Sequence, residues 1–161
     1  MRAHLGLGSN QGDRLEALRG ARSALERHGL RVAGSSSVYE TAPQGEVLDQ
    51  ADFLNACIAV DTDLDPEELL DVCKTVEREF GRRRGGPRHG PRPIDIDLLL
   101  MGATEHVSER LVLPHREVTT RRFVLEPLIE LDPALSLPDG TRLAGLLDAV
   151  ADQRVERRGS F

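Results

Sequence analysis

Hydrophobic and polar positions recur along this chain with two periods, one typical of strands and one typical of helices. Alternation with a period of two predicts four strands, at residues 2–7, 31–39, 53–62 and 94–100. Apolar side chains three and four residues apart predict helices at residues 14–28, 66–80 and 143–150. A further helix carries Leu128, Ile129 and Leu131, and Pro127 indicates that it starts late or is kinked.

The first six elements follow one another in the order strand, helix, strand, strand, helix, strand. This order is typical of a ferredoxin-like, or split βαβ, fold, in which helices pack on an antiparallel sheet. We therefore expect an α+β three-layer sandwich that forms one domain over residues 1–161. A short hairpin arm is expected at 105–112. Phe53, Asn55, Asp95 and Asp97 are expected to share the second face of the sheet.

Composition narrows the classes of partner. The chain has 161 residues and a net charge of −6, which disfavours a general grip on nucleic-acid phosphates. Lys74 is the only lysine, and no P-loop motif is present. Cys57 and Cys73 are expected to be buried free thiols, in keeping with a reducing cytoplasm. We expect no signal peptide and no segment that spans a bilayer.

The most informative stretch runs from Gly81 to Leu100 and joins an arginine-rich loop to two aspartates. Asp95 and Asp97 are two residues apart on a predicted strand, so both carboxylates lie on one face and need a cation. The arginines need anions, and they bind phosphate through planar bidentate contacts. A polyphosphate that carries magnesium meets both needs. The alternatives are a solvated basic loop or nucleic-acid patch, and a pair of aspartates that keeps an edge strand soluble.

A second candidate site lies in the apolar strand at 53–62. Asn55 is the polar exception there, and a buried amide is costly unless it is hydrogen-bonded. One interpretation is that Asn55 bonds to neighbouring backbone. The other is that it binds a ligand with adjacent donors and acceptors, with Phe53 stacking on the ligand's ring from the same face.

Several motifs together resemble the 6-hydroxymethyl-7,8-dihydropterin pyrophosphokinase family of folate biosynthesis. They are spread over nearly the whole chain and are specific in combination. They are Gly6-Leu7-Gly8-Ser9-Asn10, Ser36-Ser37-Val38-Tyr39-Glu40-Thr41, Asp52-Phe53-Leu54-Asn55-Ala56, Gly90-Pro91-Arg92-Pro93-Ile94-Asp95-Ile96-Asp97, Pro114-His115 and Arg121-Arg122-Phe123-Val124-Leu125-Glu126-Pro127-Leu128.

The resemblance implies an enzyme that transfers pyrophosphate from ATP to the hydroxymethyl group of the pterin and releases AMP. It implies that Asp95 and Asp97 hold two magnesium ions that bridge the ATP phosphates and the attacking hydroxyl. It also implies that Arg82 and Arg92 neutralise the charge that develops on the phosphates. These four residues are the expected catalytic residues.

The resemblance also implies two sets of binding residues. The expected contacts to ATP come from Lys74, Glu77, Arg84, Arg92, Leu98, Arg110, Val112, His115 and Arg121. The expected contacts to the pterin come from Ala42, Pro43, Gly45, Phe53, Asn55 and Phe123. In that arrangement Phe53 and Phe123 sandwich the ring, and Asn55 binds its pyrimidinone edge.

The sequence departs from the family at His89, where better-known members have tryptophan, and at Gly85 and Gly86, which replace bulkier residues. The expected partners are ATP and a hydroxymethyl-dihydropterin, with no nucleic acid and no membrane, and the expected protein is a cytoplasmic monomer. Two alternatives compete with this enzyme. An RNA-binding module needs aromatic platforms and a basic surface, which this acidic chain with four phenylalanines and one tyrosine lacks. Phosphoryl or nucleotidyl transfer on a similar magnesium-binding sheet leaves Phe53, Asn55 and Phe123 unexplained.

Overall fold

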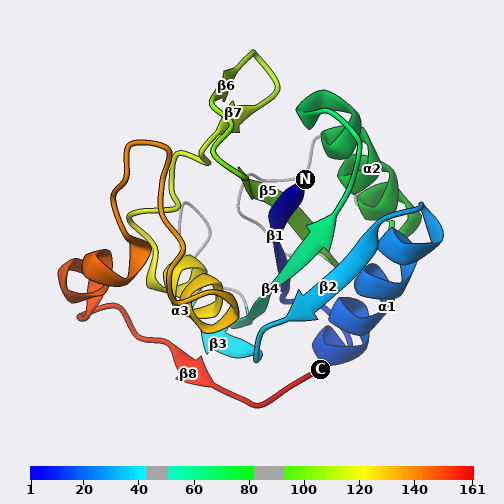
Figure 1. The fold of residues 1–161 in the computed structure, drawn as a ribbon. Helices are drawn as coiled ribbons and strands as arrows, with labels where there is room; N and C mark the ends of the chain where they lie inside the picture. Colours follow the sequence, from blue (N-terminus) through cyan, green and yellow to red (C-terminus); the bar gives the residue numbers. More distant parts are fainter. Residues whose placement is uncertain (43–50, 82–92) are drawn as a thin grey trace.

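The computed structural model describes residues 1–42, 51–81 and 93–161, and a twisted antiparallel sheet forms its centre (Figure 1). The strands are paired in the order β5-β1-β4-β3-β8, and β2 pairs with β4 as well. Their bounds are β1 Arg2–Ser9, β2 Arg31–Ser35, β3 Tyr39–Thr41, β4 Phe53–Asp61, β5 Asp95–Met101 and β8 Glu156–Arg157.

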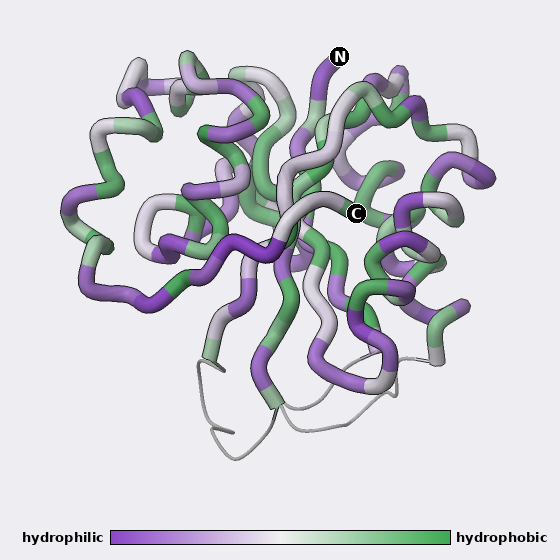
Figure 2. The backbone as a smooth tube through the Cα atoms, turned by 90° about the horizontal axis from the view of Figure 1, so that it is seen from below, coloured by the Kyte–Doolittle hydropathy of each residue, from purple (hydrophilic) through white to green (hydrophobic). Residues whose placement is uncertain are grey.

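Helices cover both faces of the sheet (Figure 1). α1 (Arg14–Arg27) and α2 (Pro66–Glu79) lie on one face and share a core with Leu5, Ile58 and Leu98. α3 (Arg122–Leu131) and the 3-10 helix η1 (Leu143–Val150) lie on the other face, where they pack with Cys57 and Leu99. Hydrophobic residues concentrate in the central strands between these two layers (Figure 2). The predicted α+β sandwich is therefore confirmed.

The helix that follows β4 begins where its sequence favours a start. Asp65 accepts a hydrogen bond from the backbone N–H of Glu68, and the Glu68 carboxylate accepts one from the backbone N–H of Asp65. Pro66 occupies the first helical position, where a missing N–H costs nothing. This capping box fixes the point at which the chain turns from β4 into α2.

The structure differs from the prediction in four elements. The range 31–39 forms two strands instead of one, because β2 and β3 both pair with β4 around a bend at 36–38. α3 begins at Arg122 and contains Pro127, so the late start was wrong. The last helix is a 3-10 helix, and β8 was not predicted. The hairpin arm is present as β6 (His106–Val107) and β7 (Val112–Leu113). Among the helices of the described ranges, none is long and apolar enough to cross a membrane.

Candidate active site

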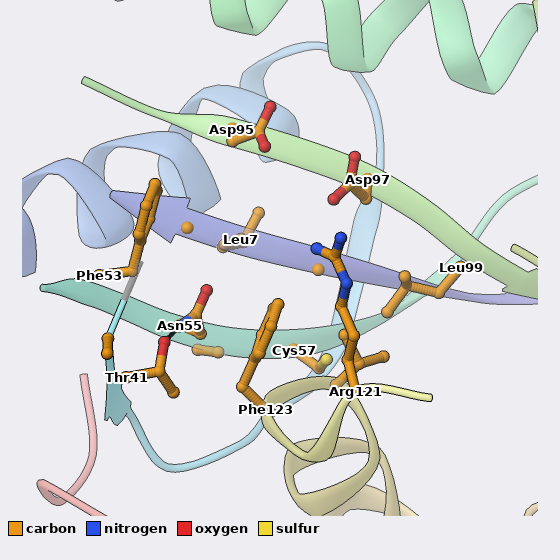
Figure 3. A pocket seen from close by; sticks show the side chains of 15 residues that line it. Leu7, Thr41, Phe53, Asn55, Cys57, Asp95, Asp97, Leu99, Arg121 and Phe123 are labelled. Atoms are coloured by element: carbon orange, nitrogen blue, oxygen red, sulfur yellow. Dashed lines mark hydrogen bonds between the residues drawn. The ribbon is translucent and has the colours of Figure 1, made fainter. Parts of the chain in front are cut away.

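Asp95 and Asp97 stand at the edge of a cleft on the face of the sheet that carries α3 (Figure 3). Their direct partners on β1 are Gly8 and Gly6. Directly opposed residues in an antiparallel pair present their side chains on the same face, so two glycines leave the space beside the carboxylates open. A Cβ atom built on Gly6 would lie 3.3 Å from Leu99 Cδ1, so the floor of the cleft is already filled to contact distance.

The surroundings of Asp97 disfavour its ionised form. Its depth in the cleft, the Asp95 carboxylate and the Glu77 carboxylate raise the pKa of Asp97 to about 7, whereas Lys74 and Arg121 act in the opposite direction. Because the Asp97 side chain is exposed to solvent, repulsion from the two neighbouring carboxylates is the main cause of this shift. A bound cation would relieve this repulsion.

The first cavity lies between β4 and the start of α3 and has about 690 Å3 of space, part of it open to solvent. The rings of Phe53 and Phe123 stand on either side of Asn55 (Figure 3). The side-chain amide Nδ2 of Asn55 donates to Thr41 Oγ1 at 2.9 Å. A Cβ atom built on Gly8 would lie 3.1 Å from Asn55 Oδ1, so the amide oxygen lies directly over β1. This cavity offers two flat apolar surfaces and one oriented amide.

The second cavity lies on the other side of the same two aspartates and is lined mostly by polar side chains. The described residues that were predicted to bind ATP and that line it are Lys74, Leu98, Arg110, Val112, His115 and Arg121. Burial lowers the pKa of His115, with Arg121 adding to the shift. Its ring Nδ1 accepts from the backbone N–H of Glu117 at 3.1 Å, which leaves Nε2 as the ring's hydrogen-bond donor.

Arg121 lies at the junction of the two cavities, and so do Asp95 and Asp97. Its guanidinium pairs with Glu117 at 2.8 Å, and its Cζ lies 5.5 Å from the centre of the Phe123 ring. In Figure 3 the guanidinium points toward Asp97. The Arg121 guanidinium therefore contacts the Phe123 ring of the first cavity and faces the carboxylates that both cavities share.

Glu77 is the described residue of the predicted ATP set that lines neither cavity. Only 1% of it is exposed. Its Oε2 accepts from the backbone N–H of Ile96 at 2.8 Å, and its Oε1 lies 3.3 Å from Lys74 Nζ. Glu77 therefore joins α2 to the backbone between the two aspartates and holds Lys74 at the second cavity.

The predicted pterin residues Ala42, Phe53, Asn55 and Phe123 all line the first cavity. Five predicted residues lie outside the described residues: Arg82, Arg84, Arg92, Pro43 and Gly45. His89 lies outside them as well. Thr41, Gly8 and Glu117 line the cavities but were not among the predicted site residues. The Gly6-Leu7-Gly8 pattern at the end of a strand was a usable signal for Gly8.

The donor set fits magnesium that is shared with a ligand. In residues 1–42, 51–81 and 93–161, no three histidine, cysteine, aspartate or glutamate side chains group closely enough to hold a metal by themselves. Asp95 and Asp97 supply carboxylate oxygens, which magnesium prefers, and phosphate oxygens and water usually complete its shell. Burial and the carboxylates of Asp95 and Glu77 raise the pKa of Asp97, and a cation bound to the pair would oppose this shift.

Comparison with known proteins identifies relatives over the whole length of the chain. A 2-amino-4-hydroxy-6-hydroxymethyldihydropteridine pyrophosphokinase of Methylorubrum extorquens is 48% identical over 158 residues, which cover 96% of this chain and 99% of the relative. A protein of the same description from Pseudomonas aeruginosa is 41% identical over 157 residues, covering 97% and 96%.

Other relatives are longer. A mitochondrial folate synthesis bifunctional protein of Arabidopsis thaliana is 46% identical over 127 residues, which cover 79% of this chain and 23% of that protein. Among solved structures, wild-type HPPK-DHPS of Plasmodium falciparum superposes with a TM-score of 0.68 at 16% identity, covering 94% of this chain and 45% of that one. At this identity the likeness supports the fold. The chain thus spans less than half of these fusion proteins.

The family model described as 7,8-dihydro-6-hydroxymethylpterin-pyrophosphokinase matches residues 4–133. That range holds most of β1 and all of β4, β5 and α3, elements that contribute residues to the two cavities. The predicted resemblance is confirmed, and the chain belongs to the 7,8-dihydro-6-hydroxymethylpterin-pyrophosphokinase family.

Proposed function

We propose that this chain transfers pyrophosphate from ATP to the hydroxyl group of 6-hydroxymethyl-7,8-dihydropterin and releases AMP and the pterin diphosphate. One observation carries the proposal. A cavity with flat apolar walls and a polar cavity with basic side chains meet at Asp95, Asp97 and Arg121. A hydroxyl bound in the first cavity and a phosphate bound in the second would meet at these three residues, which is the proximity that group transfer requires.

The first cavity suits the pterin. Phe53 and Phe123 supply faces for a flat heterocycle, and each aromatic pair adds about 1 kcal/mol beyond the area it buries. Thr41 fixes the Asn55 amide through its NH2 group, so the amide oxygen is oriented before the ligand arrives. An oriented amide discriminates among ring edges, because a ligand that lacks the matching donor leaves a buried acceptor without a partner.

The second cavity suits the nucleotide triphosphate. Lys74, Arg110, His115 and Arg121 line it with donors. Leu98 and Val112 give it apolar wall. The proposal includes Arg82, Arg84 and Arg92 as further phosphate contacts, of which Arg82 and Arg92 neutralise charge during transfer. Pro43 and Gly45 belong to the proposed pterin site.

Asp95 and Asp97 are the residues that would hold magnesium. When bound there, magnesium supplies positive charge to the phosphate oxygens and lowers the pKa of a coordinated hydroxyl. The residues themselves act in simpler ways: the carboxylates orient the hydroxyl end of the pterin, and Arg121 draws the phosphate toward it. Glu77 keeps β5 and Lys74 in place beneath the transfer point.

The identity of the nucleotide product tests the proposal. The protein is incubated with ATP, magnesium and the hydroxymethyl-dihydropterin, and the products are separated by chromatography. AMP is the expected product, ADP would indicate ordinary kinase chemistry, and an absence of turnover together with retention of RNA would favour the RNA-binding alternative.

Asp97→Ala is expected to lower turnover by at least about a thousandfold, the scale on which loss of a charge-stabilising group acts. Its circular dichroism spectrum is expected to match that of the parent, because the change removes a cation ligand and little core volume. Asp61→Ala is the matched control, since Asp61 is an aspartate of β4 that pairs with Arg2 at 2.8 Å. A turnover rate of Asp97→Ala equal to that of the parent would refute the assignment of Asp97 as a magnesium ligand.

A further inference from the structure

The spacing of the first cavity depends on where α3 sits relative to the sheet. Phe123 and Val124 belong to α3, whereas Phe53 and Asn55 belong to β4. The N-cap residue Arg121 makes no side-chain cap, and Pro127 removes one backbone donor from the interior of α3. In the first turn the Arg122 backbone N–H donates to Gln153 Oε1 at 2.9 Å, which ties α3 to the segment after η1 and not to the sheet. Buried Leu125 and Leu128 hold it against the sheet. Apolar burial is non-directional, so these contacts hold α3 down without setting its register along the strands.

Directional contacts between α3 and the sheet come from Glu130, in the last turn of α3. Its carboxylate accepts from the Ser37 backbone N–H at 3.0 Å, from Ser37 Oγ at 2.7 Å and from the Tyr39 hydroxyl at 2.6 Å. Arg157 Nη2 adds a contact at 3.3 Å, and Arg157 Nε also donates to Ser37 Oγ at 2.9 Å. Ser37 and Tyr39 are each 5% exposed. We call these four residues the Glu130 network.

The Glu130 network ties together three elements that lie far apart in the sequence. Ser37 and Tyr39 belong to the bend before β3 and to β3, and Arg157 belongs to β8, which pairs with β3. These elements lie side by side with α3 along one edge of the sheet (Figure 1). β3 also carries Thr41, the residue that holds Asn55. The network therefore connects the helix that carries one ring wall to the strand that orients the amide.

The chemistry of Glu130 indicates that its carboxylate serves contacts with other elements and not the stability of its own helix. An acidic side chain in the last turn of a helix faces the negative end of the helix dipole, so it costs α3 stability locally. Desolvation acts to raise the pKa of Glu130, but hydrogen bonds from Tyr39 and Ser37 outweigh it and the pKa is lowered. Both observations are explained if the carboxylate serves the contact with β3.

We propose that Glu130 is a positioning residue that fixes the spacing between the α3 ring wall and β4, and that it thereby sets the affinity of the enzyme for the pterin and leaves ATP binding unchanged. This inference rests on the proposed function. It predicts that loss of Glu130 changes KM for the pterin and leaves KM for ATP unchanged. The four residues line neither cavity. The elements that they join, α3 and β3, line the first cavity through Thr41, Phe123 and Val124 and do not line the second one.

Steady-state kinetics on three variants test the inference. Glu130→Ala is expected to raise KM for the pterin about tenfold or more, the scale of a misplacement below 1 Å, with KM for ATP within twofold of the parent. Tyr39→Phe removes one hydrogen bond and little volume, and it is expected to raise KM for the pterin about threefold. Glu130→Gln retains an acceptor for Tyr39 or Ser37 and is expected to lie between Glu130→Ala and the parent.

Glu79→Gln is the matched control. Glu79 also bonds across elements, to His28 at 2.6 Å, but it does so on the opposite face of the sheet. It is expected to change neither KM. A drop in thermal stability with both KM values unchanged would overturn the inference, and so would an equal rise in both. If Glu130→Ala does not fold, Tyr39→Phe still decides.

Binding of the pterin is followed in parallel by its own fluorescence, without ATP. If the parent protein binds the pterin but makes no AMP, the proposed function is wrong. The role of the Glu130 network is then tested by the dissociation constants of the variants for the pterin alone. Dissociation constants equal to that of the parent would overturn the inference whatever the parent's activity.

Discussion

At the scale of single residues, the room beside Asn55 depends on the absence of a side chain at Gly8. A Cβ atom there would lie 3.1 Å from Asn55 Oδ1 and 3.8 Å from Phe53 Cδ1. The first distance is shorter than an ordinary carbon–oxygen contact, and the amide cannot retreat without stretching its bond to Thr41. Gly8 thus protects the orientation of the amide that the proposed pterin site uses.

Gly8→Ala is therefore expected to raise the dissociation constant of the pterin about tenfold, which corresponds to about 1.4 kcal/mol. Its effect on the free energy of unfolding is expected to stay below about 1 kcal/mol, because the added methyl group is crowded by one side-chain atom and lies 3.9 Å from the nearest backbone oxygen. Titration of pterin fluorescence measures the first quantity and urea denaturation the second. Gly145→Ala is the control, since a Cβ there meets nothing within 4 Å.

Alternation along a strand was sufficient to predict that Asp95 and Asp97 share a face and that Asn55 stands beside Phe53. It was not sufficient to predict Thr41, whose hydroxyl holds Asn55, because that contact depends on the register between β3 and β4. Neither backbone bonding nor a ligand alone accounts for Asn55: its NH2 group bonds to a side chain from a neighbouring strand. Register is a long-range property that no local pattern encodes.

At the scale of elements, α2 and β5 are joined through one buried carboxylate. Glu77 accepts from the backbone N–H of Ile96 at 2.8 Å, in the middle of the Asp95–Asp97 segment. That N–H points out of the sheet toward α2. The orientation of both aspartates is therefore tied to α2, the helix that also carries Lys74 of the second cavity.

Two substitutions at Glu77 are expected to separate this structural bond from the charge. Glu77→Gln keeps an acceptor for the backbone N–H of Ile96. Glu77→Leu removes that acceptor and leaves the Ile96 N–H buried without this partner. Glu77→Leu is expected to lower the free energy of unfolding by about 1–3 kcal/mol more than Glu77→Gln does. Urea denaturation of both variants measures the difference, and equal losses would contradict the proposed link.

Elements with a strong local signal were predictable, and those held by tertiary contacts were not. Asp65 and Pro66, at the N-terminus of α2, are enough to predict where that helix begins. β8 has only two residues, and its pairing with β3 cannot be read from them. α3 tolerates Pro127 because packing against the sheet holds the helix, so the rule that proline delays a helix start failed there.

At the scale of the whole molecule, stability depends on pH through groups that act in opposite directions. Burial lowers the pKa of His4, with Arg2 adding to the shift, and the residue is 4% exposed. A folded-state pKa below the ordinary value of 6.5 means that the neutral ring is favoured in the folded protein. The contribution of neutral His4 to the free energy of unfolding is therefore fully present above pH 6.5 and is lost as the pH falls below it. The raised pKa of Asp97 has the opposite sign, since its ionisation costs stability as the pH rises toward 7.

His4→Gln isolates the first effect, because it removes the titrating ring and keeps a polar side chain of similar length. The free energy of unfolding of the parent minus that of His4→Gln is expected to be larger at pH 8 than at pH 5. Urea denaturation at both values, with a chelator present to exclude metal binding, measures this difference. An equal difference at the two values would show that His4 does not titrate between them.

The position of β1 in the sheet has a consequence for how the protein is made. β1 precedes the other strands of the described residues, yet it pairs with β4, which starts at residue 53, and with β5, which starts at residue 95. Contacts between residues so far apart in the chain slow folding. The open cleft above Gly6 and Gly8 cannot form until β5 has emerged from the ribosome. Until then β1 keeps an unpaired edge, and a nascent chain of this family is exposed to pairing with its neighbours at that edge.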